Sequence, residues 1–153
     1  FEPFTILKAN AGYAKTFFGK LTAIFTAETG FKIGSSSTTS LDFMLGGYGF
    51  KEVNNILPFY GYEALSLRGD TYLKSSITID YEIIKNHHLS LFTNIANVDD
   101  ALFQKDDWLK AMPYTGIGVG YGLNTFLGPL ELKYAYAPEC EVGELYVRVG
   151  FKF

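Results

Sequence analysis

Two histidines and a serine are the residues best suited to chemistry in this chain, at His87, His88 and Ser90. Histidine can act as a general base, and a serine hydroxyl within its reach can be activated as a nucleophile. Residues two apart on a strand share a face, so His88 and Ser90 would lie together there. The sequence therefore offers a hydrolase interpretation, with a polar turn at a strand end as the alternative.

Other reactive groups carry less weight. Four aspartates lie between residues 99 and 107 and could attract a divalent cation, but their spacing does not match an EF-hand loop. Cys140 lies between two glutamates, which disfavour a reactive thiolate. It is also the only cysteine, which excludes an internal disulfide and a cysteine metal cluster. We predict neither a metal site nor a cofactor.

Apolar and polar residues alternate strictly in eight segments, and this pattern indicates the fold class. In the last segment, Leu145, Val147 and Val149 would share one face, while Arg148 and Lys152 would lie on the other. A period of two is the signature of a β-strand. The segments also approach the roughly 9–11 residues that a tilted strand needs to cross a bilayer. They run over residues 7–14, 21–31, 41–46, 73–83, 89–96, 117–124, 130–136 and 145–153.

The composition agrees with a strand-rich membrane protein. Aromatic residues reach 17% and there are 16 glycines, which favours pleated structure and tight turns over helices. No apolar run reaches the roughly 18 residues of a transmembrane helix, so crossing by helices is excluded. A net charge of only -3 gives no reason to expect nucleic acid binding. The chain starts at Phe1 rather than Met, so we expect a mature or trimmed product.

We predict a single domain over residues 1–153, an all-β fold of eight antiparallel strands closed into a transmembrane β-barrel of the outer-membrane type. The apolar residues would face lipid and the charged residues would face the lumen. An eight-stranded barrel is filled by its own side chains, so balanced charges should pair inside it as a plug. A lipocalin-like soluble barrel, with inverted faces, is the alternative. The inward charges are Lys8, Lys74, Lys133, Arg148 and Lys152 against Glu28, Asp42, Asp80, Glu82 and Glu131.

The connections differ in length between the two ends of the expected barrel. One end would have only short turns and the other mostly longer loops, as on the periplasmic and extracellular sides of bacterial outer-membrane barrels. We therefore expect the bacterial outer membrane as the location and its lipids as partners. The expected periplasmic turns lie near residues 35–39, 86–87 and 128–129, and the extracellular connections at 16–20, 51–68, 98–113 and 138–144.

This orientation bears on the histidine and serine pair. Some eight-stranded outer-membrane barrels are lipid A deacylases that use a His-x-Ser arrangement. Here His88 and Ser90 would face the lumen beside a short periplasmic turn, whereas lipid A lies in the outer leaflet at the far end. We therefore predict no catalytic residue and no enzyme activity.

Three segments, taken in order along the chain, resemble one family. They are Asp-Phe-Met-Leu-Gly-Gly at 42–47, Leu-Ser-Leu-Arg-Gly at 65–69, and a glycine-rich stretch at 116–136 that leads to Gly-Phe-Lys-Phe at 150–153. Together they resemble the C-terminal barrel half of the bacterial surface antigen family. That family includes BamA-type assembly factors, two-partner secretion transporters and the barrels of patatin-like surface phospholipases. The resemblance covers residues 21–153.

The resemblance implies a role for the Arg-Gly pair. In that family the pair lies at the tip of a long extracellular loop that folds back into the lumen, where the arginine meets acidic groups. Arg68 and Gly69 occupy the matching positions, and a bidentate carboxylate can fix the direction of an arginine. The alternative is a solvated loop arginine, and Asp70 departs from the aromatic residue usual in the family. The acidic residues offered as acceptors for this loop latch are Asp80, Glu82 and Asp42.

The end of the chain resembles the insertion signal of outer-membrane proteins. This resemblance implies the outer-membrane assembly machinery as a partner during biogenesis. The signal residues would be Tyr146, Val149, Phe151 and Phe153.

We predict the first of three functions that are compatible with these patterns, and the other two are alternatives. The first is a plugged small barrel, alone or as a homodimer, with a structural or membrane-anchoring role and no catalysis of its own. The second is half of a larger barrel for protein translocation or outer-membrane assembly, since larger family members have more strands and N-terminal periplasmic modules. The third is a lipid-modifying outer-membrane enzyme.

Overall fold

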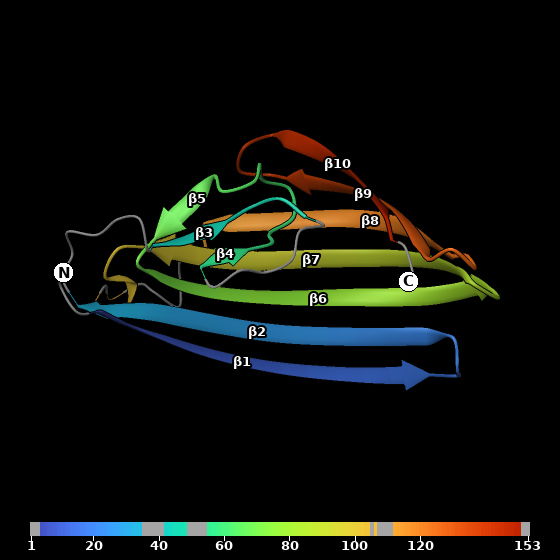
Figure 1. Cartoon of the computed structure of the whole chain (residues 1–153), viewed down its shortest axis with the longest axis horizontal. Coiled ribbons are helices and arrows are strands. Elements are labelled where there is room, and N and C mark those ends of the chain that lie inside the picture. The colour runs from blue at the N-terminus through green and yellow to red at the C-terminus, as the bar shows by residue number, and fades with distance from the viewer. Residues whose placement is uncertain (1–3, 35–41, 49–54, 105, 107–111, 151–153) are drawn as a thin grey trace.

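Seven antiparallel strands form the main sheet of the computed structural model, which describes residues 4–34, 42–48, 55–104, 106 and 112–150. The sheet is curved, and its strands lie side by side from β1 at one edge to β10 at the other (Figure 1). Within the described residues β1 and β10 do not pair with each other, so the sheet is open. In sheet order the strands are β1 Phe4–Phe17, β2 Leu21–Gly34, β6 Thr71–Ile84, β7 His87–Asp99, β8 Tyr114–Asn124, β9 Pro129–Ala137 and β10 Val142–Val149.

A smaller sheet lies between β2 and β6 in the chain and packs against one face of the main sheet (Figure 1). We call its described residues, 42–48 and 55–70, the insert. Its central strand pairs in parallel with one neighbour and antiparallel with the other. The strands are β3 Phe43–Leu45, β4 Ile56–Leu57 and β5 Leu67–Gly69, in the order β4, β3, β5.

Residues 42–46 of the segment predicted as a membrane strand at 41–46 belong to the insert instead, and Leu41 lies outside the described residues. Phe43 and Leu45 are fully buried, so their alternation serves a small core rather than a lipid-facing surface. Gly46 and Gly47 then have φ angles of 135° and 72°, which lie outside the β region and end the strand after three residues. The antiparallel all-β sheet is therefore confirmed, whereas the closed barrel of eight strands is not.

The two ends of the main sheet differ in the length of their connections, as the sequence predicted. One connection lies at the opposite end from the one predicted. The short-turn end carries the turns at 18–20, 85–86 and 125–128, and the long-loop end carries the insert, the β7–β8 connection and the turn at 138–141. The turn predicted at 16–20 lies at the short-turn end, not with the long loops, because the described residues between β2 and β6 add no strand to the main sheet. The turn predicted at 35–39 lies outside the described residues.

Local backbone geometry explains the turn between β1 and β2. Phe18 and Gly19 both have positive φ angles, 52° and 68°, as both central residues of a type I′ hairpin turn require.

Beyond β7 the chain makes one turn of 3-10 helix, η2 Leu102–Gln104. No helix in the described ranges is long and apolar enough to cross a membrane.

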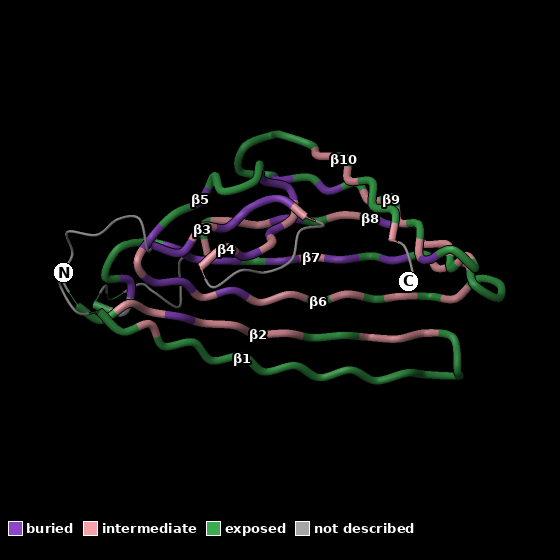
Figure 2. The backbone as a smooth tube through the Cα atoms, in the orientation of Figure 1, coloured by how far each residue is buried: buried purple, intermediate pink, exposed green. Residues whose placement is uncertain are grey.

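The main sheet has one apolar face that is exposed and one face that is covered. Leu91 and Val147 are 54% and 66% exposed on the first face, while Phe92 and Asn94 are 5% and 1% exposed on the second. Figure 2 shows the buried residues gathered in the insert and in the strands beneath it. The apolar residues thus face outward, as predicted, which opposes the inverted faces of a lipocalin-like barrel.

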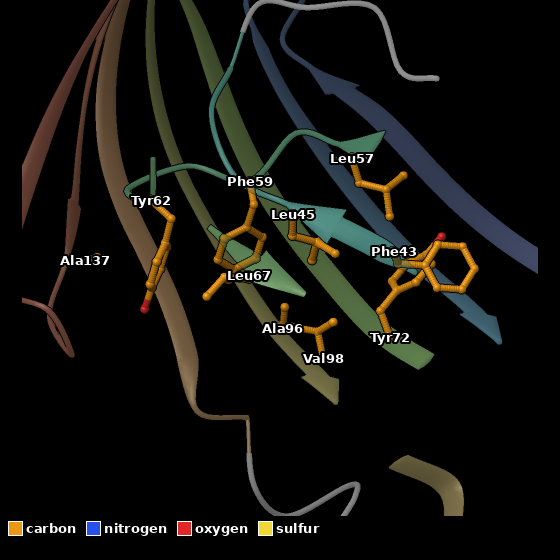
Figure 3. Close-up of a cluster of buried hydrophobic side chains, with 10 residues drawn as sticks. All are labelled: Phe43, Leu45, Leu57, Phe59, Tyr62, Leu67, Tyr72, Ala96, Val98 and Ala137. Atoms are coloured by element: carbon orange, nitrogen blue, oxygen red, sulfur yellow. The ribbon is translucent and has the colours of Figure 1, made fainter. Parts of the chain in front are cut away.

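A hydrophobic core joins the insert to this inner face (Figure 3). The rings of Phe43 and Tyr72 meet edge to face with centroids 4.7 Å apart. Gly30 makes this possible, because a Cβ there would lie 2.6 Å from the Tyr72 ring. Each fully buried aromatic or leucine side chain contributes roughly 1.5–3 kcal/mol. The core residues are Phe43, Leu45, Leu57, Phe59, Tyr62 and Leu67 from the insert, with Tyr72, Ala96, Val98 and Ala137 from the main sheet.

Candidate functional site

Two residues of the predicted loop latch, Arg68 and Asp42, lie together in the structure, where Asp42 is buried. Arg68 on β5 approaches Asp42 with 3.2 Å between Nε and Oδ2, and Lys32 on β2 approaches the other oxygen of Asp42 at 2.5 Å from its Nζ. The side chains of Asp42 and Lys32 are 8% and 5% exposed, whereas that of Arg68 is 46% exposed. A buried carboxylate is costly unless it is paired, so Asp42 draws both cations toward it. We call Lys32, Asp42 and Arg68 the ion-pair anchor.

Gly69 and Asp70 fix the chain immediately after the arginine. A Cβ on Gly69 would lie 2.6 Å from the backbone nitrogen of Asp99, so only glycine allows β5 this close to the end of β7. The Asp70 carboxylate accepts a hydrogen bond from the backbone N–H of Ala101 at 2.8 Å. The residue that departs from the family pattern therefore ties the insert to the β7–β8 connection.

The other two expected acceptors have different partners. Asp80 lies 2.7 Å from Nδ1 of His88, and the Glu82 carboxylate accepts a hydrogen bond from the Asn86 backbone N–H at 3.2 Å. Arg68 precedes the start of β6, and nine residues of strand, about 30 Å, separate that start from Asp80. Of the three acceptors that the sequence offered, the structure brings only Asp42 to Arg68.

A second cluster on the inner face was not predicted. The Lys133 ammonium on β9 donates hydrogen bonds to the hydroxyls of Tyr48 at 2.8 Å and Tyr60 at 3.2 Å, both from the insert. It also lies 4.3 Å from the centroid of the Tyr48 ring and 5.6 Å from that of Phe92 on β7. The Tyr48 hydroxyl in turn donates to Glu131 at 2.7 Å. Burial raises the pKa of Tyr60, and Tyr48 adds to this shift, so the phenol stays protonated.

Glycines on β8 make room for this cluster. A Cβ on Gly116 would overlap the carbonyl oxygen of Tyr60, and one on Gly118 would lie 2.5 Å from the Phe92 ring. Glycines at successive inward positions of a strand mark a close approach by other groups. This repeat at residues 116–122 was the one local signal that could have located the cluster from the sequence.

A third contact holds the insert at the long-loop end. The Tyr62 hydroxyl donates to the Glu139 carboxylate at 2.9 Å, and the Thr115 backbone N–H donates to the same oxygen at 3.1 Å. Burial raises the pKa of Tyr62, and Glu139 raises it further. For Glu139 burial alone would raise the pKa, but hydrogen bonds from backbone N–H groups and Tyr62 outweigh it and lower the pKa. Donor and acceptor therefore keep their charge states around neutral pH.

The histidine and serine pair lies on the inner face near the short-turn end. His88 contacts Asp80 and, at 3.4 Å, Asn124, while Ser90 is buried. These residues border a hollow of about 310 Å³. No hydrogen bond joins His88 to Ser90 within the part of the chain that the structure describes, so the nucleophile–base contact of a hydrolase is not formed there. His87 points to the other face, where it meets Tyr121.

The remaining sequence candidates take separate positions. Tyr146 points inward and Val149 is exposed on the outer face, while Phe151 and Phe153 lie outside the described residues. Cys140 is exposed in the turn at the long-loop end. Asp107 lies outside the described residues, and among those described no three acidic, histidine or cysteine side chains group as a metal site.

A curved antiparallel sheet with an apolar outer face and a polar, loop-covered inner face is the wall of a transmembrane β-barrel. The chain belongs to the OMP85 superfamily, whose family model matches residues 1–153. This confirms the resemblance to BamA-type proteins of the surface antigen family, and places the chain in the bacterial outer membrane.

A solved structure supports the same fold. It is BamA from Haemophilus ducreyi lacking POTRA domains 1–3, with a TM-score of 0.72 and 13% sequence identity. The match covers 98% of this chain and 35% of that chain, so this chain spans about a third of its length. No curated protein matches the chain.

Proposed function

We propose that this chain forms part of the wall of a larger outer-membrane barrel that acts in protein assembly or translocation, with the insert held inside the lumen. The observation that carries the proposal is the open seven-stranded sheet whose inner face is covered by the insert. Membership of the OMP85 superfamily and the much longer BamA chain support this function over a small self-closed barrel with a structural role.

Strand direction is the physical argument for a larger barrel. In a meander of seven strands, β1 and β10 both run from the long-loop end to the short-turn end. Pairing them with each other would create a parallel seam, whereas bacterial outer-membrane barrels have even numbers of antiparallel strands. The free edges of β1 and β10 therefore suit additional strands between them. A homodimer in one membrane orientation would again need parallel seams, and is less favoured for that reason.

The insert suits a wide lumen. An eight-stranded barrel is filled by its own side chains, but a wider barrel encloses space that only an additional segment can fill. Here the insert covers the inner face toward the long-loop end, while a hollow of about 310 Å³, bordered by both polar and apolar side chains, remains toward the short-turn end. By the usual arrangement of outer-membrane barrels, the long-loop end would be extracellular and the hollow would open toward the periplasm.

A folding assay in liposomes tests the proposed function. The protein that contains this chain is reconstituted, and an unfolded outer-membrane β-barrel is added as client. We expect faster acquisition of protease-resistant client than in empty liposomes, and an equal rate in both would contradict an assembly function. Deacylation of lipopolysaccharide that disappears in a Ser90→Ala variant would favour the enzyme alternative.

A further inference from the structure

The last strand of the sheet, β10, has a neighbour on only one side among the residues that the structure describes. Within the described residues β10 pairs only with β9, over Val142–Val149, and it is shorter than the other strands of the main sheet. An unpaired edge strand depends on contacts made by its side chains, because half of its backbone groups have no ladder partner. The inward side chains of β10 therefore decide how firmly it is held.

Tyr146 is the inward residue at the middle of β10, and it contacts the insert. Its hydroxyl accepts a hydrogen bond from the Gly61 backbone N–H at 3.0 Å. Its ring lies edge to face with Tyr48, at 5.7 Å between centroids, and with Tyr60 at 6.1 Å. Tyr146 is therefore attached to both tyrosines that the Lys133 ammonium binds.

Lys133 is the centre of this arrangement. Tyr48 and Tyr60 stack with centroids 4.8 Å apart and both accept hydrogen bonds from its ammonium, which also lies over both rings. The side chain of Lys133 is 16% exposed, and a desolvated cation over aromatic faces is held more strongly than an exposed one. We call Tyr48, Tyr60, Lys133 and Tyr146 the tyrosine clamp.

We propose that Lys133 and Tyr146 are positioning residues through which the insert holds the edge strand β10 against the inner face. This hold is separate from the ion-pair anchor, which joins the insert to β2 at the other side of the sheet. The inference concerns the insert and β10 alone, and does not depend on the proposed function. It gives this barrel wall a defined contact whose loss loosens one free edge.

Amide hydrogen exchange on the protein in detergent micelles tests the clamp. Tyr146→Phe removes one hydroxyl and leaves the ring, so we expect the amides of residues 142–149 to exchange about fivefold faster, the factor expected for one lost hydrogen bond. Lys133→Met removes the cation at similar side-chain length, and should accelerate the same amides at least as much. Arg68→Ala should change their exchange less than twofold.

The pattern across variants decides the outcome. Exchange in β10 that is unchanged by both Tyr146→Phe and Lys133→Met would overturn the proposal. Equal acceleration by Arg68→Ala would overturn it too, because a single anchor would then control the whole insert. Val147→Ala is the matched control, since Val147 neighbours Tyr146 but is 66% exposed on the outer face. Should Lys133→Met fail to fold, as judged by circular dichroism, Tyr146→Phe alone decides.

Discussion

The ion-pair anchor and the tyrosine clamp hold the same insert by different physics. The anchor places a buried carboxylate between two cations near β2, whereas the clamp places a cation among tyrosine rings and hydroxyls near β9 and β10. Removing one member of a buried ion pair leaves an uncompensated charge, while removing one hydroxyl from a cluster costs a single hydrogen bond. Loss of the buried carboxylate of Asp42 should therefore release the anchor in one step, whereas the clamp and the exposed Arg68 should each be lost at a smaller cost.

The largest effect is expected at Asp42. Asp42→Ala removes the carboxylate shared by Lys32 and Arg68, and should lower the free energy of unfolding by about 3–5 kcal/mol. Urea unfolding measures this change. Asp106→Ala is the control, since Asp106 is exposed in the β7–β8 connection. Equal losses in the two variants would mean that the anchor does not stabilise the insert.

A methyl group on β8 should have the next largest effect. Gly116→Ala forces a Cβ against the Tyr60 carbonyl, and overpacking of this kind costs about 1–3 kcal/mol. On the same strand and face, an added Cβ at Gly122 meets nothing nearer than 3.7 Å. Gly122→Ala should therefore be nearly neutral in the same urea measurement. If the glycine repeat has no packing role, the two variants will behave alike.

A smaller effect is expected at Arg68. Its side chain is 46% exposed, and exposed ion pairs contribute only about 0–1 kcal/mol. Arg68→Ala should accelerate proteolysis within residues 51–69 a few-fold and leave global stability nearly unchanged. Lys20→Ala, a change at the short-turn end, serves as the control. If the insert of Arg68→Ala resists proteolysis as well as wild type does, Arg68 does not act as a latch.

The smallest effect concerns pH. The pKa of Glu139 is lowered from its ordinary 4.5, so its contribution is fully present above that pH and is lost as the pH falls through the lowered value. Proteolysis of the insert should therefore become faster in wild type once the pH falls below the lowered pKa of Glu139. Glu139→Gln should flatten this dependence. An identical acid response in both proteins would assign it to other carboxylates.

The strands of the main sheet were predictable because alternation is a local property of the sequence. Leu145, Val147 and Val149 face outward as their spacing indicated. The prediction of a membrane strand at residues 41–46 was wrong for the same reason, since the short buried strand β3 shows the same alternation as a membrane strand. Only the adjacent Gly46 and Gly47 distinguish the two cases.

The site was predictable only in part. Charge and the family resemblance identified Asp42 as an acceptor for Arg68. They identified Asp80 equally, and only the length of β6 shows that Asp80 lies too far from Arg68. The tyrosine clamp joins residues 48, 60, 133 and 146, which are far apart in the chain. No local pattern connects them, apart from the glycine repeat on β8 that leaves them space.

Cysteine cross-linking between the two free edges tests the larger barrel most directly. In a Cys140→Ser background, Asn10→Cys is paired in turn with Glu144→Cys and Arg148→Cys, inward positions on β10. Asn10→Cys with Glu28→Cys is the positive control, because these residues are opposite each other on β1 and β2. We expect a disulfide in the control and none between β1 and β10. A disulfide joining β1 to β10 within one chain would show self-closure and contradict the larger barrel.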